Sequence, residues 1–397
     1  MKNILILGGD GYLGWPTAMH FSTLGFNVVV ADNYFRRNLC TSLDTGMLYN
    51  VPTLTQRANI WQELTGKRIE VVITDLTDPK NMRALFNGSA ETQYPRNSLL
   101  KDQHFDAVVH YAEQPSAPYS VMNFESADQT LTNNLRVTNN LMWAIHDLSP
   151  DTHIVKLGTM GEYGTPNIDI EEGWLDIEHN GRSGKFLFPR QASSIYHTSK
   201  IMDTDLLWWA VRTWDLRVTD LMQGPVYGLS TAETDMDDRL GTIFNYDEIF
   251  GTIVNRFVVQ SVVGHPLTVY GSGTQTRGYL HIRDTMQCVE KAVGEPAAAG
   301  ELRIFNQIME TFSVSELAEQ IAKVGISRGH NVEVKPIENP RKEAESHYYN
   351  PTYQSLLDLG VKPHYLTEQT IGHMFEVVEK HKENIRKDVI FNGVKWG

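Results

Sequence analysis

The feature that most constrains this chain is a glycine turn near its N-terminus. Gly8, Gly11 and Gly14 follow a short apolar run that indicates a strand, and an amphipathic segment then runs to about Leu24. A second apolar run ends at Asp32. Strand, glycine turn, helix, strand and acid form the dinucleotide-binding pattern, in which glycines let a pyrophosphate approach N–H groups at the helix N-terminus. We therefore expect a nucleotide-binding unit here.

The acid that ends the second strand bears on the choice of cofactor. Asp32 can hydrogen-bond a ribose diol and repels a 2′-phosphate, which favours NAD over NADP. Arg36 and Arg37 follow closely and weaken this preference, because a guanidinium suits a 2′-phosphate. Asp75, which follows the next strand, can contact the adenine amino group or cap a helix, and both interpretations stay open.

Strands alternate with helices through the first part of the chain. Further apolar runs end near His110, Leu157 and Leu221, each followed by small or polar residues. This alternation predicts an α/β fold, a Rossmann-type doubly wound parallel sheet whose ligands lie beyond the carboxyl ends of the strands.

After Gly228 the alternation breaks down, which predicts a division of the chain. We expect residues 1–228 to form an NAD-binding Rossmann domain. Residues 229–397 should form mainly a smaller C-terminal α/β lobe for the substrate, with segments near 250–265 and 278–310 able to return to the first domain.

Composition limits the partners and the compartment. Lys and Arg number 35 against 48 Asp and Glu, a net charge of -13, which argues against nucleic acid or an anionic membrane as the main partner. No apolar stretch approaches the roughly 20 residues of a membrane span. Cys40 and Cys288 stand apart from any Cys/His cluster, so we expect no metal site and a reducing, cytoplasmic location without a leader segment.

A tyrosine and a lysine one helical turn apart, Tyr196 and Lys200, give the chain its candidate chemistry. Residues at i and i+4 share a helix face, and an ammonium beside a phenol favours the phenolate. Such a tyrosine can take a proton from a sugar hydroxyl while hydride leaves the same carbon. Because this spacing is common on exposed helices, the pair alone is weak evidence for catalysis. The dinucleotide-binding pattern around the glycine turn makes that interpretation stronger.

These motifs, with Thr159 and the turn from Pro225 to Gly228, resemble the extended short-chain dehydrogenase/reductases that act on nucleotide sugars. Four longer segments are similar to the UDP-sulfoquinovose synthase branch of that family, residues 158–164, 244–252, 264–271 and 339–350. The likeness runs over nearly the whole chain. It implies conversion of UDP-glucose and sulfite to UDP-sulfoquinovose with NAD recycled in each turnover, and a homodimer through helices near 129–146 and 196–214.

The resemblance also implies the roles of the catalytic residues. Tyr196 is the expected base at the sugar O4′, Lys200 lowers its pKa and holds the nicotinamide ribose, and Thr159 hydrogen-bonds O4′. Oxidation at C4′ acidifies H5′, so that water can leave from C6′. Sulfite can then add to the resulting 5,6-ene before C4′ is reduced again.

The other expected site residues lie at strand ends or in the matching segments. The expected cofactor-binding residues are Gly8, Gly11, Tyr12, Leu13, Gly14, Asp32, Asn33, Arg36, Arg37, Asp75, Leu76, Tyr111, Ala112, Glu113, Asn133, Tyr196, Lys200, Gln223 and Val226. The expected substrate-binding residues are Gln114, Thr159, Arg190, Gln191, Tyr196, Gln223, Thr252, Arg256, Tyr270, Arg277 and Arg341. The arginines suit a diphosphate, although each one singly is more often part of a surface ion pair.

One departure from related enzymes concerns the base at C5′. Nucleotide-sugar 4,6-dehydratases carry an Asp-Glu pair after the catalytic threonine, where this chain has Met160 and Gly161. This substitution counts against simple dehydration and places Met160 among the catalytic residues. It leaves His197 and Glu162 as candidates for the C5′ base, with His197 alternatively a helix-surface residue.

A second departure concerns sulfite. Pro115 stands where plant-type members have an arginine that could face sulfite, so the sequence does not define how sulfite is delivered. Two alternatives stay open: a UDP-sugar 4-epimerase or dehydratase, and a non-catalytic NAD-sensing scaffold. Whether the product would serve sulfolipid or sulfated glycan biosynthesis is equally open.

Overall fold

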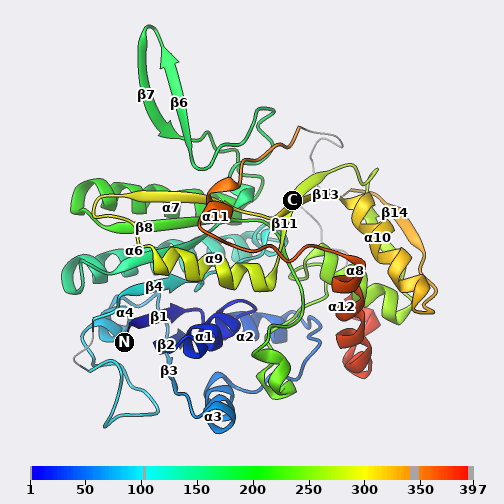
Figure 1. The fold of residues 1–397 in the computed structure, drawn as a ribbon, viewed down its shortest axis with the longest axis horizontal. Helices are drawn as coiled ribbons and strands as arrows, with labels where there is room; N and C mark the ends of the chain where they lie inside the picture. The colour runs from blue at the N-terminus through cyan, green and yellow to red at the C-terminus, as the bar shows by residue number, and fades with distance from the viewer. Residues whose placement is uncertain (1, 102–103, 340–347, 392–397) are drawn as a thin grey trace.

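The centre of the molecule is a parallel sheet of seven strands (Figure 1). The computed structural model describes residues 2–101, 104–339 and 348–391. The order across the sheet is β12 (Leu302–Gln307), β8 (Arg217–Gln223), β5 (His153–Thr159), β4 (Ala107–His110), β1 (Asn3–Leu7), β2 (Asn27–Asp32) and β3 (Ile69–Ile73). The order reverses between β1 and β4, and open sheets of this kind bind ligands at that crevice. The doubly wound parallel sheet expected from the sequence is confirmed.

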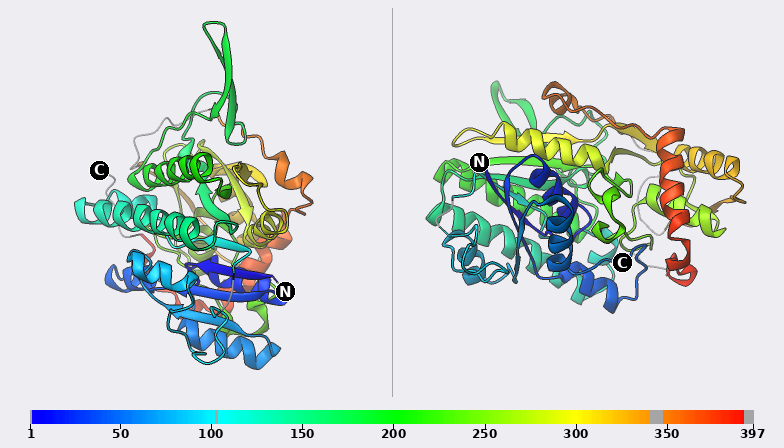
Figure 2. Two further views of the ribbon diagram at one scale, coloured as in Figure 1. Left: turned by 90° about the vertical axis from the view of Figure 1, so that its left-hand side faces the viewer. Right: turned by 60° about the horizontal axis from the view of Figure 1, so that its bottom comes forward.

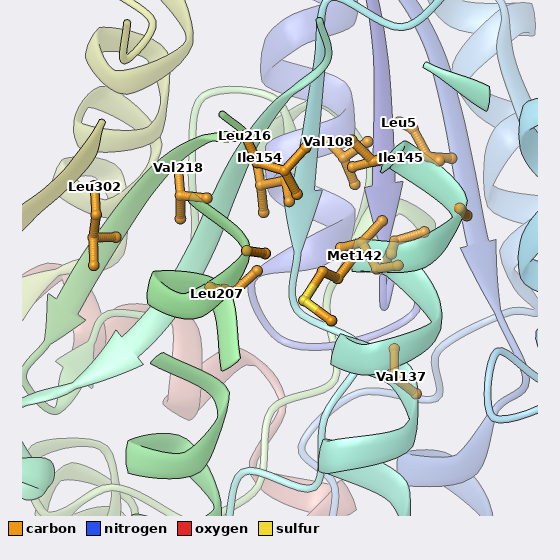
Figure 3. Packing of buried hydrophobic residues seen from close by; sticks show 14 of the residues in the cluster. Leu5, Val108, Val137, Met142, Ile145, Ile154, Leu207, Leu216, Val218 and Leu302 are labelled. Atoms are coloured by element: carbon orange, nitrogen blue, oxygen red, sulfur yellow. The ribbon is translucent and has the colours of Figure 1, made fainter. Parts of the chain in front are cut away.

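Helices cover both faces of this sheet because its strands are apolar on both sides. Ile4 and Ile6 of β1 pack toward α1 (Gly14–Thr23), α3 (Leu54–Thr65) and α9 (Ile282–Gly294). Leu5 and Leu7 point to the other face, which is covered by α4 (Pro79–Phe86), α6 (Phe124–Leu148) and α7 (Ile195–Trp214). Figure 3 shows Leu5, Val108 and Ile154 of the strands against Met142 and Ile145 of α6.

The second half of the chain builds a smaller lobe with a core of its own. Its helices α8 (Ile253–Val263), α10 (Val314–Ser327) and α12 (Glu368–Lys380) pack together over the strand pair of β10 (Leu267–Tyr270) and β14 (Val334–Ile337). A small sheet of β9 (Val226–Tyr227), β11 (Thr276–His281) and β13 (Glu310–Ser313) adjoins them. Between β11 and β13 the chain returns to the large sheet, since α9 covers one of its faces and β12 pairs with β8. The exact division at residue 228 stays a prediction.

A two-stranded hairpin extends away from the body between β5 and α7 (Figures 1 and 2). It consists of β6 (Trp174–His179) and β7 (Arg182–Leu187), which pair in antiparallel register. Asn180 and Gly181 between them both have positive φ, as a tight hairpin turn requires. The short helices α2 (Phe35–Ser42), α5 (Ala117–Ser120) and α11 (Gln354–Asp358) complete the fold. Among the described residues, no helix combines the length and apolar character needed to cross a membrane.

Candidate active site

A cavity of about 860 Å³ lies at the carboxyl ends of the central strands, between the large sheet and the smaller lobe. Small-molecule sites commonly have this size. Most of the residues expected to bind a cofactor line it, namely Gly8, Gly11, Tyr12, Leu13, Gly14, Asp32, Asn33, Arg36, Asp75, Leu76, Tyr111, Ala112, Glu113, Asn133, Tyr196, Gln223 and Val226. The expected catalytic and substrate residues that line it are Thr159, Met160, His197, Gln191, Thr252, Arg256, Tyr270 and Arg277.

The glycine turn leaves no room for side chains. A Cβ atom on Gly14 would lie 2.0 Å from the carbonyl oxygen of Gly8, and one on Gly8 would lie 2.6 Å from the carbonyl carbon of Tyr111. Gly8 also has a φ of +85°, which L side chains rarely adopt. The backbone therefore closes tightly at the start of α1, in the way that the approach of a pyrophosphate to helix N–H groups requires.

Asp32 stands at the end of β2 beside this turn. Its carboxylate accepts hydrogen bonds from the backbone N–H groups of Asp10 at 2.8 Å and Tyr34 at 2.7 Å. Burial, together with the neighbouring charge of Asp10, raises the pKa of Asp32 to about 6. An acid fixed in this place can accept the ribose hydroxyls of NAD, so the residues present fit the cofactor.

The two arginines that follow Asp32 have different surroundings. Arg37 does not line the cavity: it binds the Asp10 carboxylate at 2.8 Å and the carbonyl oxygen of Val51 at 2.6 Å. Its expected contact with the cofactor is therefore replaced by an ion pair that fixes the glycine turn. Arg36 does line the cavity, stacks on the Phe250 ring at 3.4 Å and donates a hydrogen bond to Asn245.

Tyr196 and Lys200 lie on the first turns of α7, but only the tyrosine lines the cavity. Lys200 is fully buried behind it, hydrogen-bonded to the Glu113 carboxylate and 3.5 Å from that of Asp203. Burial raises the pKa of Tyr196, and Glu113 and Glu162 raise it further. The sequence predicted that Lys200 lowers the pKa of Tyr196, but in the structure this pKa is raised. The carboxylates of Glu113 and Asp203 compensate the charge of the Lys200 ammonium. Burial also raises the pKa of Glu113, to about 7.

Glu162 is turned away from the cavity. Thr159 at the end of β5 caps the turn η1 (Met160–Glu162), its hydroxyl accepting from the N–H of Gly161 at 3.2 Å. The Glu162 carboxylate in turn accepts from the N–H of Thr159 at 3.3 Å. It is fully buried and lies 3.4 Å from the Lys156 ammonium. Glu162 therefore supports Thr159 and cannot reach a sugar in the cavity, which weighs against it as the C5′ base.

His197, the other candidate for this base, does line the cavity. Its ring occupies the place that a side chain at position 161 would take: a Cβ atom on Gly161 would lie 2.3 Å from Nε2. The hydroxyl of Ser193 lies 3.0 Å from Nδ1 and orients the ring. The glycine that replaces the dehydratase glutamate thus makes space for an imidazole.

Two of the expected substrate residues that the structure describes, Gln114 and Arg190, are not among those that line the cavity. Gln114 is buried, with its amide hydrogen-bonded to Thr130 and to the carbonyl oxygen of Ser116, so it holds the loop after β4. Arg190 lies 3.6 Å from the Glu162 carboxylate. Arg341 falls outside the described residues.

Several residues that the sequence did not single out also line the cavity, among them Glu248 and Tyr349. Glu248 accepts a hydrogen bond from the Tyr270 hydroxyl at 2.5 Å, and the Tyr349 hydroxyl accepts one from the N–H of Gly278 at 3.3 Å. Both fall in segments 244–252 and 339–350, which the resemblance had already marked. The segments were informative, but they did not show which side chains turn inward.

Comparison with known proteins agrees with this geometry. Residues 4–306 match the model of the NAD dependent epimerase/dehydratase family. The UDP-glucuronic acid 4-epimerase of Bacillus cereus, solved with UDP-glucuronic acid and NAD, has the same fold, with a TM-score of 0.69 at 17% identity over 96% of this chain and 99% of that one. Fold and site together define an NAD-dependent enzyme.

Two curated relatives extend along the whole chain. The chloroplastic UDP-sulfoquinovose synthase of Spinacia oleracea is 46% identical over 100% of this chain and 79% of its own length. The UDP-sulfoquinovose synthase of Sulfolobus acidocaldarius is 38% identical over 99% of this chain and 97% of its own length. The chain belongs to the NAD dependent epimerase/dehydratase family and, within it, to the UDP-sulfoquinovose synthases.

Proposed function

We propose that this protein is a UDP-sulfoquinovose synthase that joins sulfite to C6′ of UDP-glucose. The observation that carries the proposal is one cavity in which Thr159, Tyr196 and His197 lie together with the glycine turn, in a chain 46% identical along its length to a named synthase. When NAD is bound, it would accept a hydride from C4′ and later return it. Gly8, Gly14, Asp32 and Asp75 would hold its pyrophosphate, ribose and adenine.

Tyr196 is the acid–base group at O4′ in this proposal. Its basic form takes the O4′ proton as C4′ is oxidised and gives it back when C4′ is reduced. The hydroxyl of Thr159 hydrogen-bonds O4′ and orients the sugar. Because burial raises the pKa of Tyr196, the phenol is mostly neutral at neutral pH, and turnover should rise as the pH increases.

His197 carries the step between oxidation and reduction. The C4′ ketone acidifies H5′, and the imidazole removes that proton. The imidazolium so formed gives the proton to the C6′ hydroxyl, which leaves as water. The sulfur of sulfite then adds to C6′ of the 5,6-ene, and C5′ regains a proton. The balance is one UDP-glucose and one sulfite to one UDP-sulfoquinovose and one water.

The decisive test of this function is product analysis. Purified protein with UDP-glucose and sulfite is expected to form UDP-sulfoquinovose, identified by mass spectrometry, in amounts that follow the sulfite added. A reaction without sulfite is the control. UDP-galactose as the sole product would identify an epimerase, and a UDP-4-keto-6-deoxy sugar would identify a dehydratase; either result would overturn the proposal. Nucleotide binding without any turnover would favour a scaffold.

A homodimer through α6 and α7 is a further part of the proposal. Trp143 of α6 and Trp209 of α7 are 44% and 41% exposed, and Met202 lies on α7 at 42%. Large exposed apolar side chains on adjacent helices are typical of an interface. Sedimentation velocity should show a dimer that the double substitution Trp143→Glu and Trp209→Glu converts to a monomer. A monomeric wild type would contradict the proposal.

The compartment also stays a prediction. Cys40 and Cys288 are both free and buried, which suits the reducing cytoplasm expected from the sequence.

A further inference from the structure

A buried lysine outside the cavity lining contacts both η1, which follows Thr159, and α7, which carries Tyr196. Lys156 stands on β5 with its side chain fully buried. Its ammonium lies 2.6 Å from the hydroxyl of Thr204, 3.0 Å from the carboxylate of Asp220, 3.3 Å from the carbonyl oxygen of Lys200 and 3.4 Å from the carboxylate of Glu162. A fully buried lysine is rare unless it is paired, and this one has partners on three other elements.

Three of the four partners lead to a group that the proposed reaction uses. Glu162 accepts the N–H of Thr159, so the Lys156–Glu162 contact bears on the position of the threonine hydroxyl. The carbonyl oxygen of Lys200 and the hydroxyl of Thr204 belong to α7, the helix that carries Tyr196. One ammonium therefore connects the end of β5 to the catalytic face of α7.

We propose that Lys156 is a positioning residue, whose ammonium holds Thr159 and Tyr196 in register. The inference rests on the proposed function in that it takes Tyr196 and Thr159 as the groups at O4′. It adds a residue that touches neither sugar nor cofactor.

The charges around the phenol explain why a second lysine is needed. The titratable and charged groups that face Tyr196 and Lys156 from the surrounding elements are His110, Glu113, Glu162, Arg190, His197, Lys200, Asp203 and Asp220. The carboxylates of Glu113, Glu162 and Asp203 raise the pKa of Tyr196 after burial, whereas Lys156 lowers it.

Two of the remaining groups contribute little positive charge of their own. Lys200 is compensated by Glu113 and Asp203, which it contacts directly. Burial, together with the charges of Lys200 and Lys156, lowers the pKa of His110 well below its usual range, so its imidazole is neutral. Lys156 is paired with Glu162 and Asp220, so its loss leaves these two carboxylates without their ammonium partner. Because Glu162 already raises the pKa of Tyr196, that loss should raise it further.

The test follows reduction of bound NAD by UDP-glucose in single turnovers, without sulfite, as a function of pH. For Lys156→Met we expect a rate roughly 100-fold lower, as small displacements of reacting groups cause, with the UDP-glucose dissociation constant unchanged. Because the basic form of Tyr196 reacts and the substitution raises its pKa, the rising limb of the pH–rate profile should move to higher pH. Lys156→Arg should return the limb toward the wild-type position.

Two further variants separate positioning from folding. Lys156→Met combined with Asp220→Asn removes the nearer of the two carboxylate charges that lose the ammonium in the single variant, and it should fold while keeping the altered profile. Thr219→Val is the matched control: the neighbour of Asp220 on β8 faces the other way and hydrogen-bonds His153 at 2.9 Å. Its profile should equal that of the wild type, with thermal unfolding recorded for every variant.

A folded Lys156→Met protein with wild-type rate and pH profile would overturn the inference. Its failure is distinguishable from failure of the proposed function, because NAD reduction by UDP-glucose precedes any use of sulfite. If the wild type reduces NAD but forms no UDP-sulfoquinovose, the synthase activity fails while the role of Lys156 stands.

Discussion

Replacing Tyr196 by Phe is expected to lower kcat for UDP-sulfoquinovose formation by roughly 1,000-fold, within the range that general acid–base groups contribute. The substitution removes one oxygen and keeps the ring, so the cavity wall stays in place. The backbone N–H of Tyr196 still donates to the hydroxyl of Ser120, and the ring still contacts that of His197. Binding of UDP and the unfolding temperature should therefore change little.

The measurement is single-turnover reduction of bound NAD by UDP-glucose, with UDP binding followed by calorimetry. Tyr163→Phe is the matched control, because Tyr163 is fully buried, does not line the cavity, and its hydroxyl accepts the N–H of Gly173 at 3.2 Å. It should cost about 1–3 kcal/mol of stability and leave the rate within a few-fold of wild type. A Tyr196→Phe protein with near wild-type turnover would mean that another group handles the O4′ proton.

The sheet was predictable from local pattern, and segment 278–310 was expected to return to it, whereas the pairing partner of β12 and the hairpin were not predictable. The apolar runs of β1 and β2 indicate strands buried on both faces, and the glycine turn between them indicates their parallel connection. β12 is equally strand-like, but its place beside β8 depends on pairing across some 80 residues. Strands β6 and β7 are largely exposed, so burial leaves little pattern in their sequences.

Within the site, the sequence located the segments better than it located the side chains. Strand ends at the carboxyl edge of a parallel sheet converge, so Thr159 and Glu113 could be expected near one another. The direction in which each side chain points was harder to predict. Neighbouring helical residues such as Arg36 and Arg37 point about 100° apart, because an α-helix has 3.6 residues per turn. Which one faces the cavity depends on Asp10, a partner that lies in the glycine turn.

The buried charges were the least predictable feature. Glu162, Lys156 and Arg190 look individually like surface residues, since such side chains are seldom fully buried. Their burial is favourable only because β5, η1, β8 and the segment before α7 bring opposite charges within 3.0 to 3.6 Å of one another. That arrangement depends on tertiary packing, so no local pattern could assign Glu162 to the support of Thr159 rather than to the sugar.

Replacing His197 by Ala is expected to block the reaction after oxidation at C4′. Since the imidazole lines the cavity where Gly161 makes room for it, its loss should remove the C5′ base and lower UDP-sulfoquinovose formation by roughly 100-fold or more. Reduction of bound NAD by UDP-glucose should stay within several-fold of wild type, because Tyr196 and Thr159 are untouched. The two rates thus separate, which no loss of folding or binding would produce.

Exchange of H5′ measured in deuterium oxide without sulfite tests this assignment directly. Wild-type protein should incorporate deuterium at C5′, whereas His197→Ala should not. Glu162→Gln is the comparison variant: its amide can still accept the N–H of Thr159, and because the side chain faces Lys156 rather than the cavity, it should slow NAD reduction and exchange to the same extent. Wild-type exchange in His197→Ala would rule out the imidazole as the C5′ base. A selective loss of exchange in Glu162→Gln would return that role to the buried carboxylate.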